Sequence, residues 1–534
     1  MRVLRILARV TLIAAFGLQG PGLAWSAAAP QDAQQAVATA AAALGGVERL
    51  QAVRNLTTIG YGIYATQHGG QDVTADPEAP KKLTAANELS RVYDLENNRY
   101  RMRERRNMLF SYAVPGAHNY TPIDRALDGN IAYDILPDGK FVRIGPNLNS
   151  SSFNSGADGP RERRMWMHAN PVTAIRAALN PQNRVGNVRQ TGAETLFDVT
   201  LAQGDVLTVA LTRETGLPKW VSFISPHPNF GEVVYRTVFT GYMPFNGLLL
   251  PMGYNTKIDW RDTDYFWVHV DSYQINGNID DIKAPAEMVA AVEPVQTYKA
   301  DITPIARGLW RITGGTMVIE FADHMTLYEI NDGPVRAEAV IAAARTIRPD
   351  KPLTELIISH NHFDHSAGLR TAVANGLTII SRRANEALFR ELVTRKAPHF
   401  PDAQERTPKE MRFVPVDDHL QLKDSTNTLD IYHVIDNAHM ADAVFAYLPE
   451  HKITMEADLA TAAPVWQWWG YTYRHNVEYR KLDVEKNVPV HMEVMSYKDT
   501  LEMIEGGIGR AQDFCREQLA KGIYFPTCQT ALTW

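Results

Sequence analysis

The chain has 534 residues, of which 45% are hydrophobic and 21% are charged. A chain of this length is too long to fold around a single hydrophobic core, so two or more domains are expected. The formal net charge of −6 is small for the size, and no run of Lys or Arg occurs. Nucleic acids and anionic membrane surfaces are therefore excluded as expected partners.

The N-terminal residues have the pattern of a secretory signal. Three arginines precede an apolar stretch over residues 10–18, and Ala24 and Ser26 place small side chains where a signal peptidase reads them. The stretch is too short to cross a bilayer, which takes roughly 20 apolar residues. We predict a signal peptide over residues 1–27 and an exported protein, periplasmic or secreted, without a transmembrane segment.

The segment after the signal is predicted to be mainly antiparallel β-structure. Residues 31–55 have helical spacing, whereas from about residue 56 polar and apolar residues alternate between Pro-Asp-Gly, Gln-Gly-Asp and Asn-Gly turns. Strands joined by short turns indicate a curved antiparallel sheet over a helix such as 170–180. We expect this domain to cover residues 31–292. Its layout is similar to the half-barrel of periplasmic lipoprotein-carrier proteins.

A domain boundary is expected near residues 285–305, which contain three prolines and no strong periodicity. Beyond it, strands such as 353–359 alternate with helices such as 366–376, which is typical of a layered α/β domain. We place this domain at residues 300–495 and a C-terminal helix and tail at 496–534.

The chain contains two cysteines, Cys515 and Cys528, both near the C-terminus. In an oxidising compartment they could form one disulfide, and two separate thiols are an equal alternative. Neither lies near the histidine-rich stretch in sequence, so no thiolate ligand is expected there.

The stretch 359–368, "SHNHFDHSAG", directly follows an apolar strand. His360 and His362 are two residues apart and project to the same side in extended backbone, and Asp364 has the same parity. His365 lies where the chain turns into a helix. A solvated polar loop would explain one histidine, but four ligand-type residues within six positions favour a metal site. Imidazole and carboxylate donors suit zinc.

Residues from about 305 to 495 resemble the metallo-β-lactamase superfamily. The resemblance implies an αββα sandwich with a two-zinc site between its sheets, completed by a histidine of a later loop, a bridging aspartate and a last histidine. It assigns His360, His362 and His439 to one ion, Asp364, His365 and His491 to the other, and Asp458 to both.

The chain departs from the family pattern at three places. Met440 follows His439 where Ser or Thr is usual, and Asp458 follows Glu-Ala where Gly is commoner. His491 lies in Pro-Val-His-Met instead of Pro-Gly-His-Gly, which leaves His475 and Glu493 as competing ligands.

The chemistry that the motif predicts is metal-assisted hydrolysis by a metal-bound hydroxide. Asp364 and Asp458 are the predicted catalytic carboxylates, and no Gly-x-Ser-x-Gly elbow offers a rival nucleophile. Within the family, a bridging aspartate favours esters and lactones over β-lactams. His362 replaces the Glu of the di-iron flavoproteins, and alkylsulfatases carry Glu at the positions of His439 and Asp458.

We therefore expect an exported zinc hydrolase of an ester, lactone or related bond. The alternatives are a β-lactamase or alkylsulfatase-type hydrolase, a periplasmic binding protein for lipid or another hydrophobic ligand with an accessory metal domain, and a structural metal domain without turnover. The sequence leaves the oligomeric state open.

An aromatic segment, 464–476, follows the bridging aspartate. We predict that Trp466, Trp468, Trp469 and Tyr471 form a hydrophobic wall that binds a small apolar substrate, with Tyr473 next to them. A packed core or a dimer contact is the alternative.

Overall fold

The computed structural model describes residues 31–66, 74–76, 81–108, 121–148, 158–437, 439–460 and 470–523. The predicted signal peptide lies outside these ranges. None of the described helices combines the length and the hydropathy that a bilayer crossing requires.

Thirteen of the described strands form one antiparallel sheet in the order β6-β5-β4-β3-β2-β1-β13-β12-β11-β10-β9-β8-β7. Its strands are β1 (Asn55–Thr66), β2 (Lys82–Asp94), β3 (Arg99–Met108), β4 (Thr121–Asp128), β5 (Ile131–Ile135), β6 (Phe141–Ile144), β7 (Arg184–Thr191), β8 (Glu194–Thr200), β9 (Val206–Thr212), β10 (Pro218–His227), β11 (Gly231–Phe245), β12 (Leu248–Ile258) and β13 (Thr263–Ile275). Neighbours in chain order pair with each other, except that β6 does not pair with β7 and β1 pairs with β13, with Leu56 opposite Ile275.

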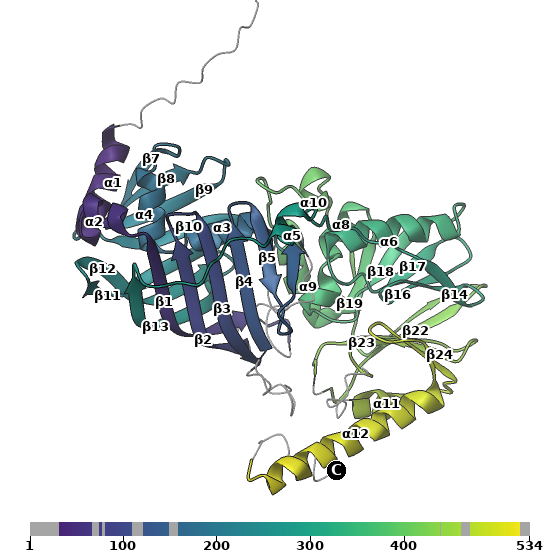
Figure 1. Cartoon of the computed structure of the whole chain (residues 1–534). Coiled ribbons are helices and arrows are strands. Elements are labelled where there is room, and N and C mark those ends of the chain that lie inside the picture. The colour runs from purple at the N-terminus through teal and green to yellow at the C-terminus, as the bar shows by residue number, and fades with distance from the viewer. Residues whose placement is uncertain are drawn as a thin grey trace, which may run out of the picture.

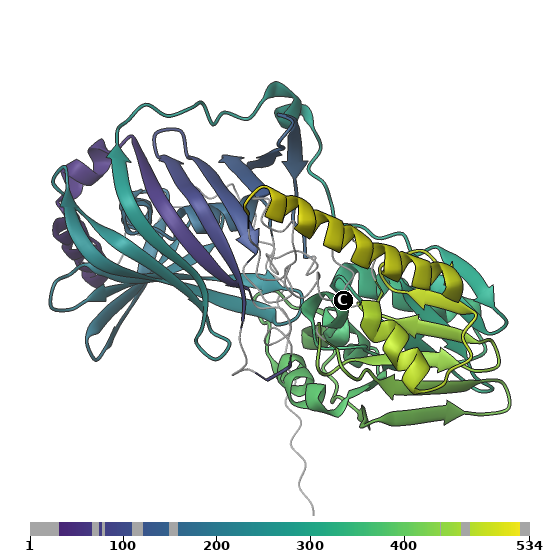
Figure 2. The ribbon, with the colours of Figure 1, turned by 90° about the horizontal axis from the view of Figure 1, so that it is seen from below.

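The sheet is strongly curved, and helices cover its concave face (Figure 2). The helices of this part are α1 (Gln31–Leu44), α2 (Val47–Ala52), α3 (Pro160–Met167) and α4 (Pro171–Leu179). The side chain of Asn170 caps α4 by accepting from the backbone N–H of Val172, and Pro171 occupies the first helical position, where no N–H is needed. Alternating buried positions of the strands pack against α3 and α4, so the core lies inside the curve.

Two further sheets follow after α5 (Ala286–Ala290) and residues 291–301, which have no regular secondary structure. The first contains β14 (Ile302–Ala306), β15 (Leu309–Ile312), β16 (Thr316–Glu320), β17 (Met325–Tyr328), β18 (Leu353–Ile357), β19 (Thr378–Arg382) and β20 (Phe413–Val416). The second contains β21 (His419–Lys423), β22 (Thr428–His433), β23 (Val444–Leu448), β24 (Ile453–Glu456), β25 (Lys486–Pro489) and β26 (Met495–Ser496).

These two sheets pack face to face, with helices on both outer sides (Figure 1). The helices are α6 (Pro334–Ile347), α7 (Phe363–Ser366), α8 (Leu369–Ala374), the 3₁₀ turn η1 (Arg383–Asn385), α9 (Glu386–Thr394), α10 (Ala403–Arg406), α11 (Gly470–Tyr479) and α12 (Tyr497–Ala520). One buried cluster joins residues of both sheets, such as Ile319 and Met455. Another joins Phe445 of β23 to Val477 of α11 and Ile504 of α12. The predicted mixed α/β fold with a large antiparallel sheet is confirmed.

The segment 496–534, where a C-terminal helix and tail are expected, contains the helix α12. Because Ile504 is buried against α11 and the second sheet, α12 is an outer layer of the α/β part. Cys515 on α12 is buried and disulfide-bonded, and Cys528 lies outside the described residues.

The large sheet contacts the α/β part through the turn between β10 and β11 and the end of β12. The side-chain amide of Asn229 donates to the carbonyl of Phe363 (3.1 Å) and to the hydroxyl of Ser366 (3.2 Å), both on α7. The ring of Phe230 meets the ring of Phe363 edge-on at 5.3 Å, and the indole of Trp260 donates to Glu391 on α9 at 2.9 Å. The large sheet thus supports the helix that begins next to His362.

Candidate metal centre

The histidine stretch lies where the parallel strand β18 ends. In this sheet β17, β18, β19 and β20 run parallel, so their carboxyl ends meet at one edge. His360 follows that end in a loop, and His362 is the residue before α7. Asp364 and His365 lie within α7, so helical backbone places Asp364 and the expected strand parity does not apply to it. Helical structure begins at Phe363, three residues before the expected start at Ser366.

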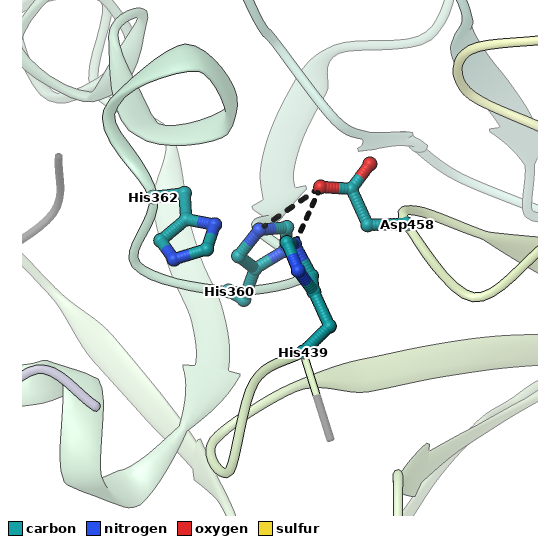
Figure 3. A group of neighbouring side chains, drawn as sticks. All are labelled: His360, His362, His439 and Asp458. Atoms are coloured by element: carbon teal, nitrogen blue, oxygen red, sulfur yellow. Dashed lines mark hydrogen bonds and ion pairs between the residues drawn. The ribbon is translucent and has the colours of Figure 1, made fainter. Parts of the chain in front are cut away.

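One group of ligand atoms comes from His360, His362, His439 and Asp458, and these atoms all lie within 4.8 Å of one another (Figure 3). The Nε2 of His439 lies 3.0 Å from Oδ2 of Asp458, and the Nε2 of His360 lies 3.7 Å from the same oxygen. His360 and His362 are fully buried or nearly so, and His439 comes from the loop between β22 and β23.

A second group comes from Asp364, His365, Asp458 and His491, again within 4.8 Å. The Nε2 of His365 lies 3.2 Å from Oδ2 of Asp458 and 3.4 Å from Oδ2 of Asp364. The Nε2 of His491 lies 3.0 Å from Oδ1 of Asp458 and 3.1 Å from Nε2 of His365. The two groups therefore share Asp458.

The donor set fits divalent metal ions. The Nε2 of His360 is buried and has no hydrogen-bond partner among the described residues. The Nε2 atoms of His365 and His491, at 3.1 Å, have the spacing of two ligands on one tetrahedral zinc, roughly 3.3 Å for Zn–N bonds of 2.0–2.1 Å. Burying an unpaired ring nitrogen, or several ring nitrogens that converge, costs free energy when no cation is present. The reason is that each nitrogen has lost its hydrogen bond to water.

The competing ligands are located elsewhere. His475 lies on α11 with its ring 3.6 Å from Asp436, and its side chain is 47% exposed. The side chain of Glu493 is 94% exposed and faces Arg311 at 3.7 Å. Among the described residues, His491 is thus the one of the three that joins the cluster.

The turn that presents Asp458 is built by Glu456, a role that the sequence did not reveal. Asp458 has φ +59°, in the left-handed region. The buried carboxylate of Glu456 accepts from the backbone N–H groups of Leu459 (3.0 Å) and Ala460 (3.2 Å) and from the amide of Asn487 (3.1 Å). Burial raises the pKa of Glu456 to about 7. The Glu-Ala departure from the family pattern therefore supplies the side chain that fixes this turn.

Glu329 is a second residue that the sequence did not reveal. It directly follows β17, at the same sheet edge as His360, and it is fully buried. Its carboxylate lies 2.6 Å from Nδ1 of His365 and accepts from the backbone N–H of Ser359 at 2.6 Å. The hydroxyl of Ser359 lies 2.8 Å from Nδ1 of His360. Both rings are thereby oriented with Nε2 toward Asp458. In the sequence, the signal that could have revealed Glu329 was an acidic residue at the end of the strand that pairs in parallel with β18.

The charges of the cluster act on one another strongly. Burial favours the neutral ring of His365, but Asp458, Asp364 and Glu329 raise its pKa well above the ordinary value. Burial would raise the pKa of Asp458, yet His365 and His491 hold it well below the usual range. Burial lowers the pKa of His360, which stays neutral as a metal ligand must.

Replacing Glu329 by Gln is expected to weaken metal binding by about 10- to 100-fold, the usual effect of removing a carboxylate behind a ligand histidine. The amide keeps an acceptor for the N–H of Ser359 and loses the charge beside His365. Competition with a chelator measures the affinity. Glu355→Gln is the control, because its carboxylate, on the same sheet, accepts from the hydroxyl of Thr326. Equal metal affinities of the two variants would contradict this role.

The described residues include only part of the predicted aromatic wall. Trp466, Trp468 and Trp469 lie outside the described residues. Tyr471, in the first turn of α11, is 45% exposed. Tyr473 is fully buried and its hydroxyl bonds the hydroxyl of Thr454 at 2.6 Å, so it belongs to the core.

Solved metallo-β-lactamase structures resemble part of this chain. One from Pontibacter korlensis has 15% sequence identity and a TM-score of 0.32, over 39% of this chain and 98% of its own. One from Hirschia baltica has 15% identity and a TM-score of 0.30, over 39% and 98%. A flavodiiron protein from Giardia intestinalis has 14% identity and a TM-score of 0.31, over 41% and 61%. No protein-family model matches the chain, and no curated protein does.

Proposed function

We propose that the protein is an exported hydrolase with two zinc ions, which cleaves an ester, lactone or related bond of a small hydrophobic substrate. One observation carries the proposal: two groups of histidine and aspartate side chains converge on the shared carboxylate of Asp458. A structural zinc site is closed by four ligands and has no need for a second group that shares one of them.

The layered architecture and the order of the ligands along the chain also support a place in the metallo-β-lactamase superfamily. In this proposal residues 300–495, extended by α12, form its αββα sandwich. Residues 31–292 form a half-barrel domain in front of it, and residues 1–27 are a signal peptide. N-terminal sequencing of the exported protein tests the signal, and cleavage near Ser26 or Ala27 is the expected result.

The roles of the side chains follow from their positions. His360, His362 and His439 would hold one ion and Asp364, His365 and His491 the other. Bound zinc would supply a Lewis acid and would lower the pKa of water from 15.7 to about 7. Oδ2 of Asp458 faces His360, His365 and His439, whereas Oδ1 faces His491. Asp364 and Asp458 are the carboxylates placed to orient water and to carry its proton to the leaving group.

The donor atoms favour zinc. All the described ligand atoms are imidazole nitrogens or carboxylate oxygens. Nitrogen-rich sites of this kind suit zinc better than magnesium or calcium, which take oxygen ligands. His362, at a position where di-iron flavoproteins carry Glu, favours hydrolysis over redox chemistry.

The bond that is cleaved is inferred from Asp458. Metallo-β-lactamases generally lack a bridging aspartate, whereas lactonases and related esterases of the superfamily have one. A β-lactamase is the runner-up, and the similar solved structures named above are its support. An alkylsulfatase-type enzyme ranks below it, because His439 and Asp458 replace the glutamates of that group.

Metal content and substrate class test the proposal together. The purified protein is expected to contain two zinc ions per chain and to hydrolyse at least one ester or lactone in a screen that includes β-lactams, phosphodiesters and sulfate esters. His362→Ala is expected to lose both metal and activity, whereas His475→Ala, on α11, keeps them. Less than one ion per chain, with no loss in His362→Ala, would overturn the proposal.

The aromatic segment is proposed to bind the apolar part of the substrate. Trp468→Ala and Trp469→Ala are each expected to raise KM about tenfold with little change in kcat, since one lost apolar contact of roughly 1.4 kcal/mol corresponds to that factor. Tyr479→Ala is the matched control, because its side chain, at the end of α11, is 61% exposed. An unchanged KM for every substrate in both tryptophan variants would exclude this role.

A further inference from the structure

The turn between β10 and β11 brings Asn229 of the large sheet to α7, the helix that carries two of the predicted ligands. Asn229 is 2% exposed. Its side-chain amide donates to the carbonyl of Phe363 at 3.1 Å and to the hydroxyl of Ser366 at 3.2 Å. These are the first and the last residues of α7, and Asp364 and His365 lie between them. One side chain of the large sheet therefore contacts both ends of the segment that presents these two ligands.

Apolar packing joins the same turn to α7. Phe363 is fully buried, its ring meets the ring of Phe230 edge-on at 5.3 Å, and the ring of His227 lies 5.9 Å away. His227 also fixes the shape of the turn, because its Nδ1 accepts from the backbone N–H groups of Asn229 (3.2 Å) and Phe230 (3.3 Å). The amide of Asn229 is thus presented by a turn that is itself hydrogen-bonded and packed against Phe363.

The residues that follow in the chain hold the turn close to the α/β part. Gly231 has φ +76°, and a Cβ atom added there would lie 2.8 Å from Cβ of Ala397 and 2.8 Å from Nη2 of Arg370. A close approach and a left-handed backbone together require glycine at this position. The carboxylate of Glu232, which is buried, accepts from the backbone N–H of His399 at 2.9 Å. The turn therefore has a fixed position relative to the domain that contains the metal centre.

The helix α7 depends on such contacts for its position. It has four residues, about one helical turn, and a first turn is unfavourable by itself because several residues lose their freedom for one hydrogen bond. Within the α/β part, the carbonyl of Asp364 accepts from the backbone N–H of Asp332, and Nδ1 of His365 lies 2.6 Å from Glu329. These contacts lie in the middle of α7, whereas the amide of Asn229 contacts its two ends.

The two ligand groups use α7 to different extents. The group that contains His491 has two members on this helix, Asp364 and His365. The group that contains His439 has no member on it among the described residues, because its other two histidines precede the helix and Asp458 follows β24. A displacement of α7 would therefore disturb the His491 group more than the His439 group.

We propose that Asn229 is a positioning residue for the metal centre, through which the large sheet holds α7 where the His491 group needs it to bind an ion. The inference rests on the proposed function, since it takes both groups to bind zinc. Asn229 acts through the backbone of Phe363 and the hydroxyl of Ser366, so its loss changes the arrangement of the ligands and not their identity. The N-terminal half of the chain thereby takes part in the geometry of the hydrolytic site.

Zinc affinities of variants that keep one ligand group test this inference on the full mature chain. His439→Ala leaves the His491 group intact, and His491→Ala leaves the His439 group intact. Adding Asn229→Ala is expected to weaken zinc binding about tenfold in the His439→Ala protein and by no more than about twofold in the His491→Ala protein, since partners that orient metal ligands contribute on this scale. Competition with a chromophoric chelator measures both affinities.

Asn255→Ala is the matched control, because the amide of Asn255 donates to Asp264 within the large sheet, at 3.1 Å. Both affinities are expected to stay the same in this variant. Equal losses of affinity in the two backgrounds with Asn229→Ala would indicate a general loss of structure and overturn the proposal. An unchanged affinity of the His491 group would overturn it as well.

A second variant decides the question if Asn229→Ala does not fold. Ser366→Ala removes one of the two acceptors on α7 and is expected to weaken zinc binding about threefold in the His439→Ala protein only, as suits the loss of one hydrogen bond. No loss there, or the same loss in the His491→Ala protein, would contradict the role of Asn229. If the protein without any substitution bound no zinc, the proposed function would fail and this inference with it.

Discussion

Replacing Asp458 by Asn is expected to remove at least one metal ion and to lower kcat/KM by about a thousandfold. The reason is that the carboxylate proposed to hold both metal ions and to orient water is lost. Among the described residues, the carboxylate of Asp458 is the one side chain common to both ligand groups. An amide keeps the size of the side chain but has one oxygen and no charge, so it cannot serve both groups. Elemental analysis and steady-state kinetics on the most active substrate measure the two effects.

The control for this variant is Glu493→Gln, which makes the same chemical change two residues after His491. The side chain of Glu493 is exposed and outside the cluster, so metal content and rate are expected to stay the same. Two retained ions in Asp458→Asn, with a rate within tenfold of the unmodified protein, would contradict the bridging role of Asp458.

Replacing Trp260 by Ala is expected to lower the free energy of unfolding by about 3–5 kcal/mol, the usual range for a large buried aromatic residue. Trp260 is 1% exposed and its ring lies 5.3 Å from that of Phe230. Its indole N–H donates to Glu391 at 2.9 Å, and the guanidinium of Arg261 pairs with the same carboxylate. The variant therefore removes packing and a hydrogen bond where the large sheet meets α9.

Denaturant unfolding, followed by circular dichroism, measures this loss. Trp220→Ala is the matched control, because Trp220 is only partly buried on the large sheet, and a loss of about 1 kcal/mol is expected for it. If Trp260→Ala were no less stable than Trp220→Ala, the contact between the two parts of the chain would contribute little to stability.

The seven residues that were named from the sequence as candidate ligands are the ones that the structure brings together in two groups. His360 and His362 come directly after an apolar strand, whereas His439, Asp458 and His491 were expected only from the resemblance to the metallo-β-lactamase superfamily. His491 was favoured over His475 and Glu493 for its position after the strand-like stretch 487–490, and among the described residues it is the one of the three in the cluster. His491 directly follows β25 and Val490, and its Nε2 lies 3.1 Å from Nε2 of His365.

Residues that support the ligands were not predicted. Glu329 lies 36 positions from His365, and only the parallel pairing of β17 with β18 makes them neighbours. The acid at position 456 looked like a departure from a family motif, whereas in the fold it fixes the turn of Asp458. The helical position of Asp364 was missed for a local reason, since α7 has only four residues and gives no periodic signal.

The pairing of β1 with β13 affects the order in which the curved sheet folds. Leu56 pairs with Ile275, so one edge of β1 has no partner strand until slightly more than half of the chain has been synthesised. Contacts between residues so far apart in sequence close slowly, because a long loop must lose its freedom first. The curved sheet therefore closes late, and the arginines and tyrosines on its inner face stay in contact with water until then. Chains that end before β13 are expected to expose that edge of β1 to other chains.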